Sequence, residues 1–228
     1  MTFNEIISIL EQQSDKAIIK GKERVAITSE KIYGIKVSVL RQIAKKCGKN
    51  KELGLKLWEY GYLETRMLAS MIYPPEDCDS ELMDSWVKCF DNWEITDQCV
   101  MNLFEKIALN DSIKKAYGYC EQEAEFIKRT GFVIFARLAG SSKKAANQTF
   151  LDFFPVILKH CKDERNFVKK AVNWAIRGIG KRNNELRLKC IELCEEILKT
   201  DNKTSIWIAK DSLKELTDEK IISRIKNK

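Results

Sequence analysis

Apolar residues recur along almost the whole chain at intervals of three and four positions, a pattern that predicts amphipathic helices. Alternation typical of strands is nearly absent. An irregular segment ends at Gly34. A helical stretch ends at Gly48, two helical stretches are separated near Gly61, and Pro74 with Pro75 forces a break. We expect helices over residues 3–13, 15–24, 36–47, 51–60, 63–73, 80–90, 92–109, 111–120, 123–139, 143–159, 165–180, 184–198, 203–213 and 218–226.

Successive pairs of these helices recur at roughly 35 to 45 residues, which is the spacing of HEAT-like repeats. The pattern therefore predicts an all-α fold, an α-solenoid of HEAT-like antiparallel helix pairs with a concave basic face. We expect one domain over residues 1–228. A globular helical bundle is the alternative, because no repeated sequence signature accompanies the spacing.

The composition excludes several classes of protein and of catalytic site. No stretch approaches 18 consecutive apolar residues, and the first residues lack the pattern of a signal peptide, so a cytoplasmic protein without a membrane span is expected. The eight cysteines form no C-x-x-C pair, which favours buried free thiols and no metal site. His160 is the only histidine, and its place at a helix end is typical of a cap rather than a catalytic base.

The charge is unevenly distributed. The net charge is +7, and residues 158–190 alone hold ten Lys/Arg against three Asp/Glu. The rest of the chain is therefore close to neutral, and the local excess indicates a polyanion partner. A solvated lysine-rich face is the alternative.

The segment from Asp91 to Asp97 predicts the start of a helix, with Asp91 as the N-cap and Glu94 completing a capping box. Trp93 and Asp97 are four residues apart and share a face. A carboxylate beside a tryptophan at the edge of an apolar face is either paired with a buried arginine or held in a cleft to face a cation.

Arg129 begins a helix that is apolar all round over residues 132–136, which predicts a central, buried position. A charge there must be paired or must line a wet groove. Asp97 and a phosphate are both candidate partners, and the pattern does not rank them.

The helix over residues 165–180 has one apolar face. Lys170, Trp174, Arg177 and Lys181 fall together on the opposite face. An aromatic ring within a basic stripe suits phosphates, sugars and bases. The alternative is a tryptophan packed on a neighbouring repeat beside lysines that extend to solvent. Trp58, Trp86 and Trp207 lie in apolar helical patterns and are expected in the core. Tyr33 is expected either to pack or to serve a groove.

These motifs together resemble the bacterial AlkD-like DNA alkylation repair family, which consists of HEAT-like repeat DNA glycosylases. The resemblance covers nearly the whole chain. Its carriers are Tyr33-Gly-Ile-Lys-Val-Ser-Val-Leu-Arg41, Trp93-x-x-x-Asp97, Lys128-Arg129-Thr130 and Lys170-Ala-Val-Asn-Trp-Ala-Ile-Arg177.

The resemblance implies excision of cationic N3- and N7-alkylated purines from duplex DNA, without insertion of the damaged base into a pocket. The family's two tryptophans, aspartate and arginine match Trp93, Trp174, Asp97 and Arg129. Asp97 would stabilise the positive charge that develops on the deoxyribose. DNA contacts are expected from Lys170, Arg177, Lys181, Arg182 and Tyr33.

Two other functions remain open: a non-catalytic protein that recognises distorted or branched DNA, and a helical-repeat scaffold for proteins. The glycosylase hypothesis expects no cofactor, no metal and no membrane partner. It expects a monomer that binds duplex DNA containing alkylated bases.

Overall fold

The structure is a computed structural model that describes residues 1–226, and these residues form helices and loops without a β-strand. The all-α prediction is therefore confirmed for the described part of the chain. The chain divides into two compact units, Met1–Ile107 and Ala108–Lys228. The prediction of one domain over residues 1–228 stays a prediction.

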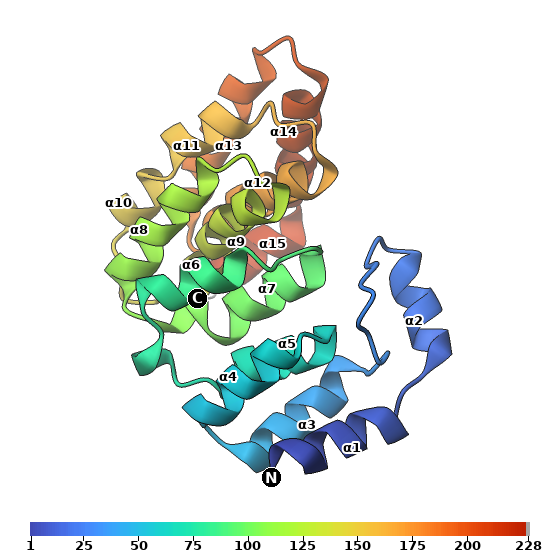
Figure 1. The fold of residues 1–228 in the computed structure, drawn as a ribbon. Helices are drawn as coiled ribbons and strands as arrows, with labels where there is room; N and C mark the ends of the chain where they lie inside the picture. The colour runs from blue at the N-terminus through green and yellow to red at the C-terminus, as the bar shows by residue number, and fades with distance from the viewer. Residues whose placement is uncertain (227–228) are drawn as a thin grey trace. The chain divides into compact units, whose positions relative to one another are not determined.

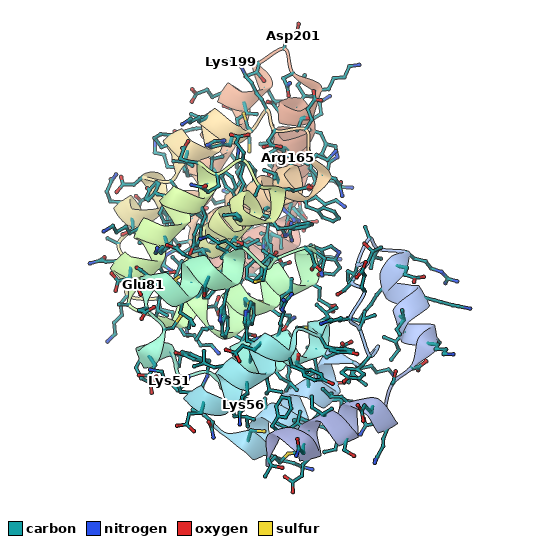
Figure 2. The ribbon with its side chains drawn as sticks, in the orientation of Figure 1. Lys51, Lys56, Glu81, Arg165, Lys199 and Asp201 are labelled. Atoms are coloured by element: carbon teal, nitrogen blue, oxygen red, sulfur yellow. The ribbon has the colours of Figure 1, made fainter. Side chains whose placement is uncertain are left out.

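The first unit consists of successive short helices (Figure 1). Most are joined by loops of a few residues, and the connection between α2 and α3 is longer and covers residues 24–36. Charged side chains such as Lys51, Lys56 and Glu81 are exposed on its surface (Figure 2). Its elements are α1 (Phe3–Gln12), α2 (Lys16–Glu23), α3 (Val37–Cys47), α4 (Lys51–Tyr60), α5 (Leu63–Ile72), the 3-10 turn η1 (Pro75–Asp77), α6 (Ser80–Val87), α7 (Trp93–Asn102) and the 3-10 turn η2 (Phe104–Lys106).

The second unit contains the longest described helices, among them α9, which lies at its centre, packed against α8 and α12 (Figure 1). Helix α12 in turn packs against α13 and α14. The elements are α8 (Leu109–Cys120), α9 (Glu125–Ser141), α10 (Asn147–Leu151), α11 (Phe154–His160), α12 (Asn166–Gly180), α13 (Asn184–Leu198), α14 (Lys203–Leu216) and α15 (Glu219–Lys226).

The predicted helix over residues 143–159 is wrong, because two helices, α10 and α11, occupy this range. Pro155 lies in the first turn of α11. Proline has no N–H, and its ring clashes with the carbonyl four residues earlier, which here belongs to Leu151, the last residue of α10. The apolar period continues through the break, so periodicity alone did not reveal it.

The predicted bounds of the helix over residues 92–109 are also wrong at the C-terminal end. Helix α7 ends at Asn102. The fully buried Leu103 and Phe104 continue the apolar pattern beyond it, and Phe104 is the first residue of the 3-10 turn η2. The N-cap is Asn92 rather than Asp91: the Asn92 side chain accepts hydrogen bonds from the backbone N–H groups of Glu94 and Ile95. Capping by Asn92 places the first helical residue at Trp93.

Helix α9 is buried on nearly all sides, as its sequence predicted, and Phe132 to Phe135 have no exposed surface. Two glycines permit its close packing. A Cβ atom on Gly131 would lie 2.6 Å from the carbonyl oxygen of Ala116 in α8, and one on Gly178 of α12 would lie 2.8 Å from that of Ala136. Both distances are shorter than van der Waals contact, so glycine is required where these helices meet.

Stacked tryptophans form part of the core of the first unit. Trp58 and Trp86 are buried with their ring centroids 3.9 Å apart, which confirms the core prediction for both. The same prediction is wrong for Trp207, which is 39% exposed. Helix α14 buries the face that contains Ser205 and Ile208, and Trp207 lies on its other side.

The loop that connects α2 to α3 is held by a buried carboxylate. Glu64 of α5 has no exposed surface and accepts hydrogen bonds of 2.9, 2.9 and 3.1 Å from the backbone N–H groups of Tyr33, Gly34 and Ile35. The carboxylate therefore satisfies three successive amides that would otherwise be buried without acceptors.

The Glu64→Gln variant is expected to lower the free energy of unfolding by about 2 kcal/mol, because an amide nitrogen would replace one acceptor oxygen and face an N–H group. Chemical denaturation measures this change. The exposed Glu59 of α4 offers the same substitution as a control. Equal stability of the Glu64→Gln and Glu59→Gln variants would show that the three hydrogen bonds do not hold the loop.

Among the described residues, no helix is both long and apolar enough to cross a membrane. The eight cysteines are free thiols, six of them buried.

Candidate functional site

Trp93 and Asp97 lie one turn apart at the start of α7. The indole of Trp93 is partly exposed, and its Nε1 donates a 2.9 Å hydrogen bond to the carbonyl oxygen of Val25. Asp97 is 8% exposed, so its carboxylate is largely removed from water. The first unit therefore presents a fixed aromatic ring followed, one turn on, by a nearly buried acid.

A second contact fixes the N-terminus of α7 on the end of α2. Glu94 forms an ion pair with Lys22, and both side chains are about nine-tenths buried. Glu94 does not complete the predicted capping box, because the N-cap is Asn92 and the third helical residue is therefore Ile95. Trp93 and Glu94 thus bind two successive points of one segment, Lys22 and Val25, which limits the movement of the Trp93 ring.

Tyr33 is buried in a cluster of aromatic rings. Its ring is 7% exposed and stacks on Tyr62 with centroids 4.3 Å apart, and its hydroxyl lies 3.4 Å from that of Tyr60. Burial, followed by the hydrogen bond to Tyr60, raises the pKa of Tyr33. These contacts give Tyr33 a packing role in the first unit, and a DNA contact from this side chain stays a prediction.

In the second unit, the first turn of α9 is tied to the loop before α12. The ammonium of Lys128 lies 3.6 Å from a carboxylate oxygen of Asp163. Burial opposes ionisation of Asp163, but hydrogen bonds from Arg165 outweigh it and lower the pKa of this carboxyl. Arg129 is 5% exposed and donates a 2.7 Å hydrogen bond to the carbonyl oxygen of Phe167.

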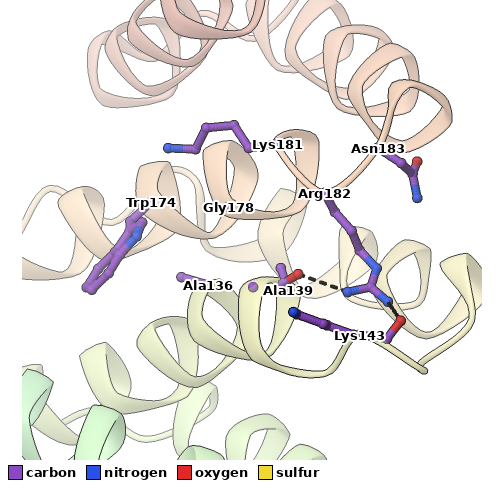
Figure 3. A pocket seen from close by; sticks show the side chains of 9 residues that line it. Ala136, Ala139, Lys143, Trp174, Gly178, Lys181, Arg182 and Asn183 are labelled. Carbon is purple, nitrogen blue, oxygen red and sulfur yellow. Dashed lines mark hydrogen bonds between the residues drawn. The ribbon is translucent and has the colours of Figure 1, made fainter. Parts of the chain in front are cut away.

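Trp174 of α12 lies between two pockets of the second unit. The larger has a volume of about 590 Å³, and Trp174 and Arg182 lie toward its opposite ends (Figure 3). Gly140 leaves open space at one side of this pocket, since no atom lies within 4 Å of a Cβ placed there, whereas α9 and α12 are in close contact at Gly178. The pocket is lined by Ala136, Ala139, Gly140, Lys143, Trp174, Gly178, Lys181, Arg182 and Asn183.

Arg182 is largely engaged by backbone groups at its end of this pocket. Its guanidinium donates hydrogen bonds of 3.0, 2.9 and 2.8 Å to the carbonyl oxygens of Ala139, Lys143 and Ala145, two of which are drawn in Figure 3. It also lies 4.5 Å from the ring centroid of Phe150. Arg182 therefore fixes the segment between α9 and α10, and its predicted DNA contact stays a prediction.

The smaller pocket, about 350 Å³ in volume, brings together several residues that the sequence had singled out. Arg129 from α9 and Lys170, Trp174 and Arg177 from α12 share it with residues of α14. Its complete lining is Arg129, Lys170, Asn173, Trp174, Arg177, Trp207 and Asp211.

A single carboxylate balances two cations of the basic stripe. Glu215 of α14 accepts hydrogen bonds of 2.5 Å from both Arg177 and Lys181. Burial opposes ionisation of Glu215, but the hydrogen bonds from Lys181 and Arg177 outweigh it and lower its pKa. Glu215 is therefore ionised at neutral pH, and this group of three side chains has a net charge of +1 instead of +2.

The sequence interpretation missed Trp207 and Lys143, which line the two pockets beside Trp174. A signal for Trp207 was present. On a helical wheel Trp207 falls with Lys203, Lys210 and Asp211, opposite the face that is buried. No such signal marked Lys143, since it lies in the loop between α9 and α10.

The described geometry thus has two parts. The first unit holds the acid and one tryptophan on α7, and the second unit places a partly exposed tryptophan among cations of α9, α12 and the loop after α9. Among the described residues, no cluster of histidine, cysteine and carboxylate side chains is suited to hold a metal ion.

Comparison with known proteins identifies the class. The sequence profile of the DNA alkylation repair enzyme family matches residues 6–216. The chain therefore belongs to the DNA alkylation repair enzyme family. Comparison with curated proteins gives no match.

A solved structure confirms the HEAT-like repeat fold. It represents a family related to the HEAT-like repeat DNA glycosylases with affinity for branched DNA structures. The two chains are 19% identical, with a TM-score of 0.77 over 92% of this chain and 94% of the other. One designed armadillo repeat protein is 17% identical, over 83% of this chain and 89% of its own. A second is 15% identical, over 79% of this chain and 92% of its own. Both have a TM-score of 0.38, which is too low to inform the assignment.

Proposed function

We propose that this protein is a DNA glycosylase that excises positively charged N3- and N7-alkylated purines from duplex DNA. The observation that carries the proposal is membership of the DNA alkylation repair enzyme family across residues 6–216. Asp97, Trp93, Trp174 and Arg129, which match the excision residues of the AlkD-like family, all lie within this range.

The chemistry of the substrate suits the available residues. An N7- or N3-alkylated purine is cationic and leaves readily, so its excision does not require a strong general acid. Positive charge develops on the deoxyribose as the glycosidic bond breaks, and an ionised carboxylate stabilises it. Asp97 would supply that charge, and its low exposure would strengthen the interaction because little water screens it.

The aromatic and basic residues would bind the DNA. The faces of Trp93 and Trp174 attract a cationic centre through their π-electrons. Arg129 would hold a backbone phosphate, and Lys170, Arg177 and Lys181 would add affinity that is independent of sequence. DNA as the partner and eight free thiols favour a reducing compartment, the cytoplasm.

A second candidate function is the recognition of branched DNA without excision. It is supported by the similarity over 92% of the chain to a structure whose family has affinity for branched DNA structures. The presence of Asp97, both tryptophans and Arg129 in this chain favours the glycosylase.

Release of free bases separates the two functions. Duplex DNA treated with a methylating agent is incubated with the wild-type protein, and the soluble fraction is analysed for 7-methylguanine and 3-methyladenine. The glycosylase proposal expects both bases in proportion to the protein added. Tight binding of a four-way junction with no release of bases above the spontaneous level would favour the second candidate instead.

The Glu215→Gln variant is expected to bind duplex DNA about three-fold more tightly than the wild type, because loss of the carboxylate leaves Arg177 and Lys181 for phosphates. Fluorescence anisotropy at low salt measures the affinity. Glu196 is exposed on α13, and Glu196→Gln makes the same change of charge as a control. An equal gain in both variants would assign the effect to net charge alone and would contradict a role for the Glu215 ion pairs.

A further inference from the structure

Trp207 is one of few large apolar side chains that are exposed in the described part of the chain. It is 39% exposed, although tryptophans are highly buried on average. The ammonium of Lys169 lies 5.3 Å from the centroid of its ring. An exposed indole beside a lysine is the arrangement in which proteins bind unpaired bases, which stack on the ring while cations attract the phosphates.

The ring of Trp207 borders a pocket of suitable size. Trp207 and Trp174 both line the pocket of about 350 Å³, which is within the range of about 300–1,000 Å³ that holds small ligands. The two tryptophans come from different helices, α14 and α12, so the aromatic surface does not depend on one helix face.

The other groups of the pocket suit a nucleotide. Lys170 supplies positive charge for a phosphate. Arg129 and Arg177 add to the positive charge of the lining, although Arg129 also bonds the carbonyl oxygen of Phe167 and Arg177 is also paired with Glu215. The Nε atom of Arg177 is buried, and no hydrogen-bond partner for it occurs among the described residues. Asp211, the carboxylate of the lining, offers an acceptor of the kind that binds the amino groups of bases.

We propose that this pocket holds one unpaired nucleotide of the bound DNA, with its base stacked on Trp207 and its phosphate near Lys170 and Arg177. The pocket shares Trp174 and Arg129 with the excision residues that the family resemblance identifies, and Trp207, Lys170 and Asp211 lie outside that set. The inference rests on the proposed binding of DNA, but it requires no excision. It gives the protein a reason to prefer DNA that has an unpaired base over fully paired DNA.

The test compares two unmodified duplexes, one fully paired and one with a single unpaired thymine, by fluorescence anisotropy. The wild type is expected to bind the bulged duplex more tightly. Trp207→Ala is expected to lower affinity for the bulged duplex about ten-fold and to leave affinity for the paired duplex unchanged, since stacking on one base is lost. Trp207→Phe keeps an aromatic face and is expected to retain most of the preference.

Leu188 of α13 is 46% exposed, and Leu188→Ala serves as the control for removal of an exposed apolar side chain. Thermal melting confirms that each variant is folded. Equal affinity of wild type and Trp207→Ala for the bulged duplex overturns the inference, as does an equal loss on both duplexes. The DNA in this binding test contains no alkylated base, so its result does not depend on excision. A failure to excise alkylated bases would contradict the proposed function and would leave the result of the binding test unchanged.

Discussion

The Asp97→Asn variant is expected to release 7-methylguanine about 100-fold more slowly than the wild type. The substitution keeps the size of the side chain and removes its negative charge, and loss of one preorganised electrostatic group typically reduces the rate by about 100- to 1,000-fold. Single-turnover rates with protein in excess measure the chemical step rather than binding.

Two controls accompany this variant. Affinity for unmodified duplex DNA is expected to remain within about three-fold of the wild type, because the proposed role of Asp97 concerns a charge that develops only during reaction. Asp111 is exposed in the first turn of α8, and Asp111→Asn is expected to excise at the wild-type rate. A rate for Asp97→Asn equal to that of Asp111→Asn would exclude Asp97 from the chemistry.

The Gly131→Ala variant is expected to lower the free energy of unfolding by about 3 kcal/mol, the largest effect on stability that we expect for a single methyl group. The added Cβ would lie 2.5 Å from Sγ of Cys120, 2.6 Å from the carbonyl oxygen of Ala116 and 2.8 Å from the backbone nitrogen of Cys120. Two of these atoms belong to the backbone of α8, so α8 and α9 would have to separate. Chemical denaturation monitored by circular dichroism measures the change.

Gly118 of α8 offers the matched control. No atom lies within 4 Å of a Cβ placed there. Gly118→Ala is therefore expected to stabilise the protein by about 0.5–1 kcal/mol, because alanine loses less conformational freedom in a helix. If Gly131→Ala also stabilises the protein, the contact between α8 and α9 is looser than described.

Periodicity predicted most of the fold because each helix buries an apolar face of its own. The period of 3.6 residues places α9 and α12 correctly, and the uniformly apolar run beginning at Phe132 predicts the central position of α9. Periodicity fails where burial continues across a break in the helix. Pro155 and the turn at Leu103 interrupt the helical backbone but not the apolar pattern. The helices predicted from the pattern over residues 143–159 and 92–109 are therefore too long.

The candidate site was less predictable, because it depends on contacts between residues distant in sequence. Spacing grouped Lys170, Trp174 and Arg177 on one face of α12. It did not show that Glu215, on another helix, would neutralise part of this charge. The spacing of residues also did not predict that Arg182 would donate hydrogen bonds to backbone carbonyl oxygens.

Trp207 shows how a single residue can be misread. An aromatic residue among apolar neighbours is typical of a core, and this prediction held for Trp58 and Trp86. The neighbours of Trp207 on the helical wheel are charged, and the structure leaves its ring exposed. The face of a helix decides burial more reliably than the local density of apolar residues.

The most direct test of the central proposal uses a duplex with one 7-methylguanine and wild-type protein in excess. Mass spectrometry follows the free base over time, and gel shift confirms that all the DNA is bound. The glycosylase proposal predicts release of 7-methylguanine well above the rate of spontaneous depurination. Release at the spontaneous rate from fully bound DNA would contradict it.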